Sequence, residues 1–184
     1  AGLLNSAWPE IRSAAAELFP LPPTKNNKPL PSIPELAKLG GNAQRGRILF
    51  NTEATCAKCH VVNGIGKDVG PNLSEIGTKL GKHALHESIL FPSAGISHNY
   101  ETWAITLANG TVVTGILVSQ TPEEVTLKNN EALVRTFKKS EIDDMAKQTI
   151  SLMPADVQKL LTQQDLVDVV EYLTTLKKAE TAGK

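Results

Sequence analysis

The stretch Cys56-Ala57-Lys58-Cys59-His60 decides how the rest of the chain is interpreted. Its two cysteines are the only ones in the sequence, and their close spacing excludes a long-range disulfide. Two thiols at this spacing can each add to one vinyl group of the same porphyrin. The next residue, His60, can then present an imidazole nitrogen to the iron. The motif therefore predicts one covalently attached haem with His60 as an axial ligand.

A structural zinc half-site and a redox dithiol are the alternatives for the same cysteine pair. Zinc requires two further ligands. His83 and His86 stand at positions i and i+3 of a predicted helix and are the candidates for them. The features downstream of the cysteines, a Gly-Pro-Asn-Leu loop and a Met-Pro pair, have no role in a zinc module, so we favour haem.

An electron-carrying haem needs a second axial ligand, and a methionine thioether raises the reduction potential relative to a second imidazole. The chain has two methionines. Met153 directly precedes Pro154 and the amphipathic C-terminal segments, so we predict it as the distal ligand. Met145 lies in a charged stretch and is a weaker candidate, and His98 is the remaining alternative. We expect His83, His86 and His98 to be surface or helix-end residues.

The composition excludes several classes of function. Nineteen basic residues balance nineteen acidic ones among 184 residues. This balance predicts no strongly charged surface for binding nucleic acid or a membrane. No apolar run is long enough for a transmembrane helix. Since the chain begins without methionine or a signal peptide, we expect a processed protein or a piece of a longer one.

Helical periodicity dominates the first half of the chain. A short helix is expected within residues 1–19, with Pro9 at its first position. Six prolines follow within residues 20–34, which we interpret as an extended strap or linker. Further helices are predicted at residues 42–51, capped by Asn42, and at about 82–90.

A β-rich insert is predicted at about residues 100–138. Its four expected strands are Thr102–Leu107, Thr111–Ser119, Val125–Lys128 and Leu133–Phe137, with a tight turn at Asn109-Gly110. We expect Asp143 and Asp144 to lie in a solvated turn after this insert.

Helical periodicity returns after the insert. Pro154 is expected to open a short helix that ends near Leu161. Thr162 and Asp165 form a capping pair for a last amphipathic helix.

From Asn42 to Leu176 the chain resembles a class I c-type cytochrome domain, of the haem-binding type described from planctomycetes and verrucomicrobia. The resemblance rests on six parts of the sequence: Gly46–Phe50, Cys56–His60, Val69–Leu73, Phe91–Ala94 with Tyr100–Trp103, Ser151–Pro154 and Asp168–Leu173.

The resemblance implies a fold and a set of residue roles. The expected fold is mainly α: residues 1–41 form an N-terminal helix and strap, and residues 42–184 form the cytochrome c domain with its insert. His60 would be the proximal ligand and Met153 the distal one. The Pro71 carbonyl would accept a hydrogen bond from His60, so the cofactor-binding set is Cys56, Cys59, His60, Pro71 and Met153. Gly46 and Phe50 would cross the last helix near Tyr172.

The function expected from this resemblance is electron transfer without catalysis. The protein would carry one covalent haem c and accept electrons from a partner protein or a fused dehydrogenase domain. The expected compartment is the periplasm or an equivalent one. If Met153 did not bind, an open or histidine-ligated iron would instead suit a gas sensor or a peroxidase.

Overall fold

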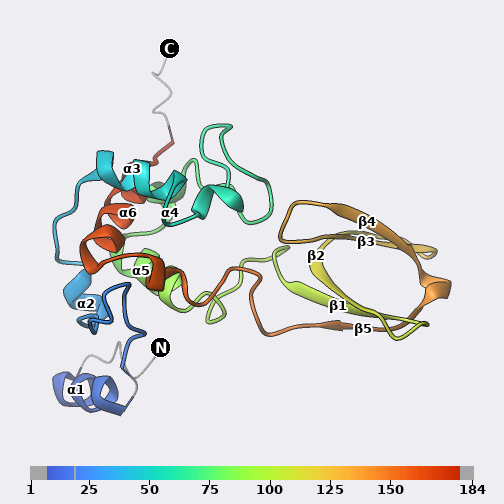
Figure 1. Cartoon of the computed structure of the whole chain (residues 1–184), viewed down its shortest axis with the longest axis horizontal. Helices are drawn as coiled ribbons and strands as arrows, with labels where there is room; N and C mark the ends of the chain where they lie inside the picture. Colours follow the sequence, from blue (N-terminus) through green and yellow to red (C-terminus); the bar gives the residue numbers. More distant parts are fainter. Residues whose placement is uncertain (1–7, 19, 179–184) are drawn as a thin grey trace.

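The computed structural model describes residues 8–18 and 20–178, and the remaining terminal residues and residue 19 lie outside this description. A helical lobe and a sheet lobe lie side by side (Figure 1). The helices are α1 Pro9–Leu18, α2 Ile33–Leu36, α3 Ala43–Asn51, α4 Ile76–Lys79, α5 Lys82–Leu90 and α6 Gln163–Thr175, with short 3-10 turns η1 Cys56–Lys58 and η3 Val157–Leu160. None of the described helices is long and apolar enough to cross a membrane.

Helices α3 and α6 cross in direct backbone contact at Gly46. A Cβ atom on Gly46 would stand 1.9 Å from the Asp168 carbonyl oxygen, so no other residue fits without moving a helix. One turn further along, the rings of Phe50 and Tyr172 meet edge to face with centroids 5.7 Å apart. The expected crossing of Gly46 and Phe50 near Tyr172 is confirmed.

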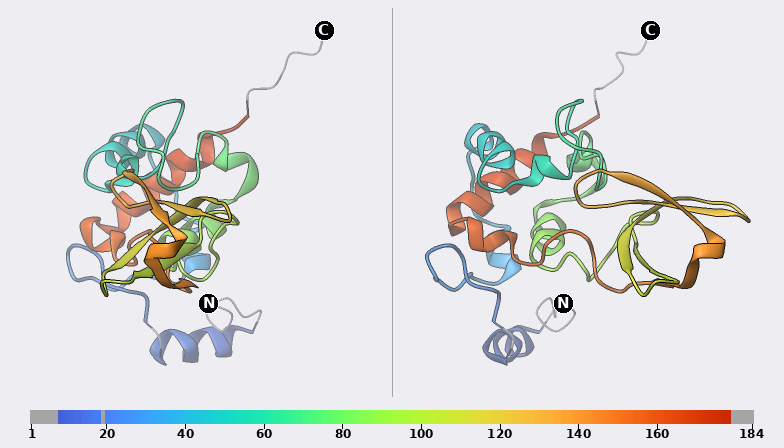
Figure 2. Two further views of the ribbon diagram at one scale, coloured as in Figure 1. Left: turned by 90° about the vertical axis from the view of Figure 1, so that its right-hand side faces the viewer. Right: turned by 45° about the vertical axis from the view of Figure 1, so that its right-hand side comes forward.

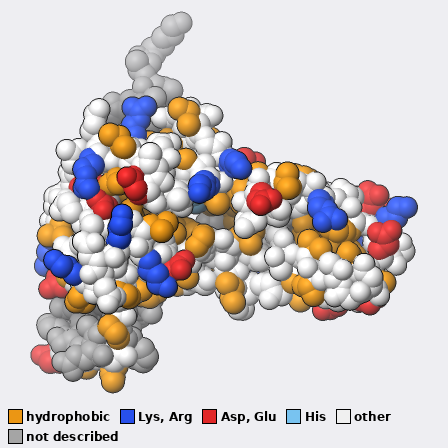
Figure 3. Space-filling model, viewed as in Figure 1, with side chains coloured by type: hydrophobic (Ala, Val, Ile, Leu, Met, Phe, Trp, Pro, Cys, Tyr) orange, Lys and Arg blue, Asp and Glu red, His pale blue; other side chains and the backbone are white. Residues whose placement is uncertain are grey.

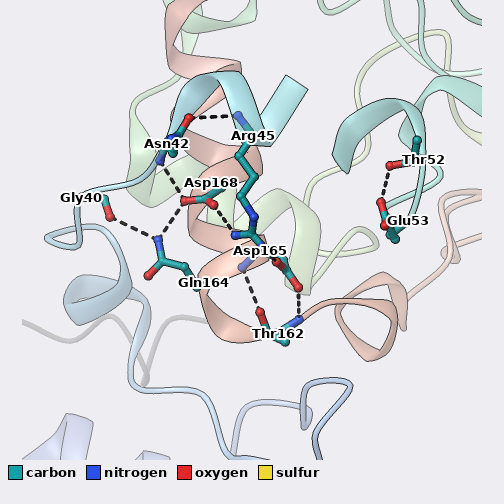
Figure 4. Close-up of polar contacts among 9 residues, drawn as sticks. All are labelled: Gly40, Asn42, Arg45, Thr52, Glu53, Thr162, Gln164, Asp165 and Asp168. Carbon is teal, nitrogen blue, oxygen red and sulfur yellow. Dashed lines mark hydrogen bonds and ion pairs between the residues drawn. The ribbon is translucent and has the colours of Figure 1, made fainter. Parts of the chain in front are cut away.

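A polar network holds the same two helices together at their N-terminal ends (Figure 4). Arg45 forms ion pairs with both Asp165 and Asp168. Asp168 is almost fully buried and also accepts hydrogen bonds from the Asn42 backbone N–H and from Gln164, each at 2.8 Å. Asp165 completes the capping box with Thr162, as the sequence predicted.

These contacts lower the pKa of both carboxyl groups. Burial alone raises the pKa of Asp168, but hydrogen bonds from Asn42, Gln164 and Arg45 outweigh it, and the net shift is below the ordinary value of 3.8. For Asp165 the donors that outweigh burial are Thr162 and Arg45. A lowered folded-state pKa means that this stabilisation is fully present above 3.8 and is lost as pH falls through the folded-state values.

We predict that Asp168→Asn lowers the free energy of unfolding at neutral pH by about 1–3 kcal/mol, because it weakens a buried network of charged hydrogen bonds. The loss should shrink in acid, where the native carboxylate is itself protonated. Denaturant titrations at neutral and acid pH measure both values. Asp156→Asn is the control, since Asp156 forms only an exposed pair with Lys159 at 3.5 Å. Equal losses in the two variants would contradict the prediction.

The proline-rich strap contains no helix before Ser32, makes a turn at residues 25–27, and then enters α2. Leu21, Leu30 and Ile33 are buried in the main core, and the Lys25 N–H donates to the Leu161 carbonyl at 2.8 Å. The expectation of an extended segment through residue 34 is therefore wrong at its end. Pro34 stands in the first turn of α2, where no helical N–H bond is required of it.

The sheet lobe has five antiparallel strands in the order β4-β3-β2-β1-β5. They are β1 Thr102–Leu107, β2 Val112–Gln120, β3 Glu124–Lys128, β4 Val134–Lys138 and β5 Ile142–Lys147. The sheet curves around a small core of its own, which is made by Ile105, Val125, Leu127 and Phe137. The first four strands match the sequence expectation to within one or two residues.

The fifth strand, β5, was missed, and Asp143 and Asp144 lie in it rather than in a turn. A register shift in the pairing of β1 with β5 explains the error. Ile105 pairs with Met145 and Leu107 pairs with Ile142, so one residue of β5 is left over between them. The two inward-facing apolar residues therefore stand three positions apart, and the alternation that identifies a strand is absent.

The mainly α fold class expected from the sequence is also wrong. Helices account for 33% of the residues and strands for 20%, and the five-stranded sheet projects from the helical lobe as a second body (Figure 2). The expected insert ended at residue 138, whereas the sheet continues to Lys147.

Candidate haem-binding site

The cysteine motif begins a few residues after α3 and is shaped by a sharp change of backbone direction. Thr55 has φ of 56°, a left-handed conformation that is uncommon for a β-branched residue. Residues Cys56–Lys58 then form the 3-10 turn η1, and the Cys59 and His60 N–H groups both donate to the Cys56 carbonyl. Both thiols are free. The turn therefore brings Cys59 and His60 back to the backbone of Cys56.

His60 is held in one tautomer by a backbone contact. Its Nδ1–H donates to the Pro71 carbonyl at 2.7 Å, which is the hydrogen bond expected from the resemblance. Burial lowers the pKa of the imidazole, and the bond to Pro71 opposes this only in part. A neutral ring with Nδ1 protonated leaves the lone pair on Nε2, which is the form that binds a metal.

Two glycines make room for this arrangement. A Cβ atom on Gly70 would stand 2.6 Å from His60 Cε1, so the ring lies flat against the Gly70 backbone. Gly66 has φ of 115°, and a Cβ atom there would stand 2.1 Å from the His60 carbonyl oxygen. The glycine-rich loop therefore folds back over His60 because it lacks side chains at these points.

His60 and Met153 line the same two adjoining hollows between the helices and the sheet lobe. The two hollows also share Cys59, Ile89 and Leu152. Aliphatic side chains form most of their surface. The sheet lobe contributes Ile116, and Tyr100 comes from the segment that leads into β1. The cavity thus depends on both lobes.

The residues of the cavity fit a haem group. It is mostly apolar, as a porphyrin requires, and His60 Nε2 is a nitrogen donor that forms no hydrogen bond with any described residue. Both cysteines of the motif line one of the two hollows. Ser97 and Tyr100, which carry hydroxyl groups, line the other hollow, where carboxylate groups of a cofactor could be received. The sequence pattern does not reveal the contribution of Tyr100 and Ile116, because it depends on how the lobes meet.

The rival iron ligands lie elsewhere. Met145 packs against the core of the sheet lobe. The His98 side chain is 88% exposed. His86 is fully buried, with Nδ1 bonded to the Lys82 carbonyl at 2.8 Å, so the expectation that it is a surface or helix-end residue is wrong. It occupies the face of α5 that packs away from the cavity, whereas Leu85 and Ile89 line the cavity.

The cysteines also differ from a zinc or dithiol site. In residues 8–18 and 20–178 no group of three or more Cys, His, Asp or Glu side chains comes together, so the pair gains no further ligands there. Burial raises the pKa of the Cys56 thiol to about 12 and also raises that of Cys59. Redox-active and metal-binding cysteines are instead activated by a lowered pKa.

Comparison with known proteins agrees with this geometry. The family model "Cytochrome c" matches residues 43–106, which run from α3 through the cysteine motif to β1. Residues 43–106 are therefore similar to a cytochrome c domain. Domains of this family carry electrons on covalently bound haem c and are typically extracytoplasmic. No curated protein matches the chain.

The match covers the attachment side of the cytochrome c domain but stops before Met153 and α6. It supports haem-based electron transfer in general. The more specific planctomycete and verrucomicrobial subgroup is not confirmed by this match.

We predict that Gly70→Ala displaces the His60 ring, because the added methyl group overlaps Cε1, and that it would weaken the expected bond of His60 to haem iron. The purified protein should show a high-spin component in its absorption spectrum and a lower thermal midpoint. Gly95→Ala is the matched control, since Gly95 lines the same cavity but has open space around its Cα. Identical spectra for the two variants would show that the ring is not held by this contact.

Proposed function

We propose that this chain is an electron-transfer protein that carries one haem c with His60 and Met153 as axial ligands. The observation that supports it most directly is that both residues line one cavity beside the two free thiols. Bound haem supplies a metal centre that accepts and releases a single electron. The protein determines the reduction potential of the haem and how far the haem is exposed to solvent.

The Met153 loop is positioned by contacts that cross the base of the sheet lobe. The Met153 N–H donates to Ser151 Oγ, and the Ser151 N–H donates to Ser93 Oγ, both at 3.1 Å. Just before this loop, the Gln148 N–H donates to the Thr102 carbonyl at 2.8 Å. The loop is thus held between β5 and the segment that follows α5, which limits how far the thioether can move.

Two further contacts attach the sheet lobe to the His60 side of the cavity. Lys128 of β3 forms an ion pair with Asp68 at 3.0 Å, in the loop that covers His60. Asn130, in the β3–β4 turn, lines the hollow that contains Cys56. We infer that the sheet lobe shields part of the haem edge from water, because its residues complete the cavity surface.

The proposed donor is a dehydrogenase, either a partner protein or a domain of the same polypeptide, and the proposed compartment is the periplasm or its equivalent. The neutral overall charge, with nineteen residues of each sign, favours recognition through local contacts rather than through a strong long-range field.

Covalent attachment is tested with the cysteines. We predict that Cys56→Ala and Cys59→Ala each leave haem bound through one thioether and that the double variant retains none covalently. Acid–acetone extraction followed by mass spectrometry measures retention. Haem that stays with the double variant after extraction would contradict the proposed attachment.

The distal ligand is tested with Met153. We predict that Met153→Ala lowers the reduction potential by about 100 mV, a part of the ~0.8 V range over which axial ligands tune haem, and allows carbon monoxide to bind rapidly. Met145→Ala is the control, since Met145 lies in the other lobe. An unchanged potential in the Met153 variant, with rapid carbon monoxide binding by the native protein, would instead favour the open-site sensor or peroxidase.

A further inference from the structure

The sheet lobe ends in two edges that have no partner strand. β4 and β5 are the outermost strands, and no described strand pairs with the outer side of either. The 3-10 turn η2, Lys139–Glu141, connects them at the end of the lobe farthest from the helices (Figure 1). An open edge presents unpaired N–H and C=O groups that can add a strand from another chain.

The two edges carry opposite charge. β4 contains Arg135 and Lys138 and no acidic residue, and both side chains belong to exposed residues. Arg135 lies over the Phe137 ring, 5.2 Å from its centroid. β5 contains the exposed Asp143 and Asp144, directly after its first residue, Ile142. Acidic and basic side chains stand close together at the end of the sheet lobe (Figure 3).

The one basic residue of β5 does not cancel its negative charge. Lys147 forms an ion pair with Glu101 at 2.8 Å, so its charge is balanced within the chain. Asp143 and Asp144 have no such pair among the described residues. The edge of β5 is therefore net negative, and the edge of β4 is net positive.

We propose that copies of this chain associate head to tail, with β4 of one copy adding to β5 of the next. Edges of equal sign would repel a second copy and prevent such addition, whereas edges of opposite sign favour it. The strands have similar lengths, five and six residues. Antiparallel pairing, the arrangement throughout this sheet, brings Lys138 beside Asp143 and Asp144 of the neighbouring copy.

The contact joins two different surfaces, so it is heterologous and builds either a closed ring or a filament. Neither edge strand contributes a residue to the haem cavity. The assembly therefore leaves the site open to redox partners and does not depend on the function proposed above. Haem absorption serves as an independent check that each variant is folded.

The first experiment measures the mass of the full-length, haem-containing protein in solution by light scattering over a wide concentration range. The native chain should form oligomers that dissociate as salt is added, because charge pairs at an exposed edge are screened. Reversing β4 with Arg135→Glu and Lys138→Glu should give a monomer. Reversing β5 with Asp143→Lys and Asp144→Lys should do the same. A native chain that is monomeric at every concentration would overturn the proposal.

The second experiment mixes the two reversed variants. One variant carries two negative edges and the other carries two positive edges, so each is monomeric alone while the mixture should form oligomers of alternating subunits. A third chain with all four reversals should associate as the native chain does. If the mixture forms no oligomers, or if a variant with only one strand reversed associates like the native chain, the β4–β5 contact is excluded. Unchanged haem spectra throughout would show that such a failure concerns assembly alone and leaves electron transfer untouched.

Discussion

The close crossing of α3 and α6 at Gly46 is the constraint on which the rest of the structure depends. Because the Gly46 Cα lies directly on the Asp168 backbone, the two helices have one angle and one register available. The cysteine motif begins only a few residues after α3, and α6 supplies Leu173 and Val169 to the haem cavity. The crossing therefore fixes where both thiols and His60 lie relative to the cavity. The network of Arg45 with Asp165 and Asp168 secures the same crossing at its other end.

The second organising feature is the way in which the sheet lobe joins the helices. Its two connections are the segment that leads through Tyr100 to β1 and the segment from β5 to Met153, and both line the cavity. A change in the position of the sheet lobe would therefore reach Met153, the proposed distal ligand, through only a few residues. The ion pair between Lys128 and Asp68 attaches the lobe on the opposite side, next to the loop of His60. The lobe is thus a structural part of the site rather than an appendage.

Several elements could be predicted because their signals are local. Asn42 and the Thr162–Asp165 pair identified the starts of α3 and α6, since capping depends on residues only three positions apart. The turn at Asn109-Gly110 identified the first hairpin. In contrast, β5 gave no alternating pattern, because a register shift leaves an extra residue between Ile142 and Met145. The burial of His86 also had no local signal, since it results from α2, η3 and α6 packing around α5.

The sequence by itself determined the chemistry: two thiols and an imidazole within five residues specify how a porphyrin could be attached, and no folding information is needed to recognise that pattern. The tertiary structure alone decided which distant residues complete the site. Met153 and His60 are 93 positions apart in the chain. They line one cavity together with Tyr100 and Ile116, because the chain returns to this cavity after the five strands. The tertiary structure also left the outer edges of β4 and β5, which have opposite charge, without a partner among the described strands. Strand order depends on pairings between residues far apart in the sequence. Contacts of this kind are set by packing and backbone pairing, which local residue patterns do not encode.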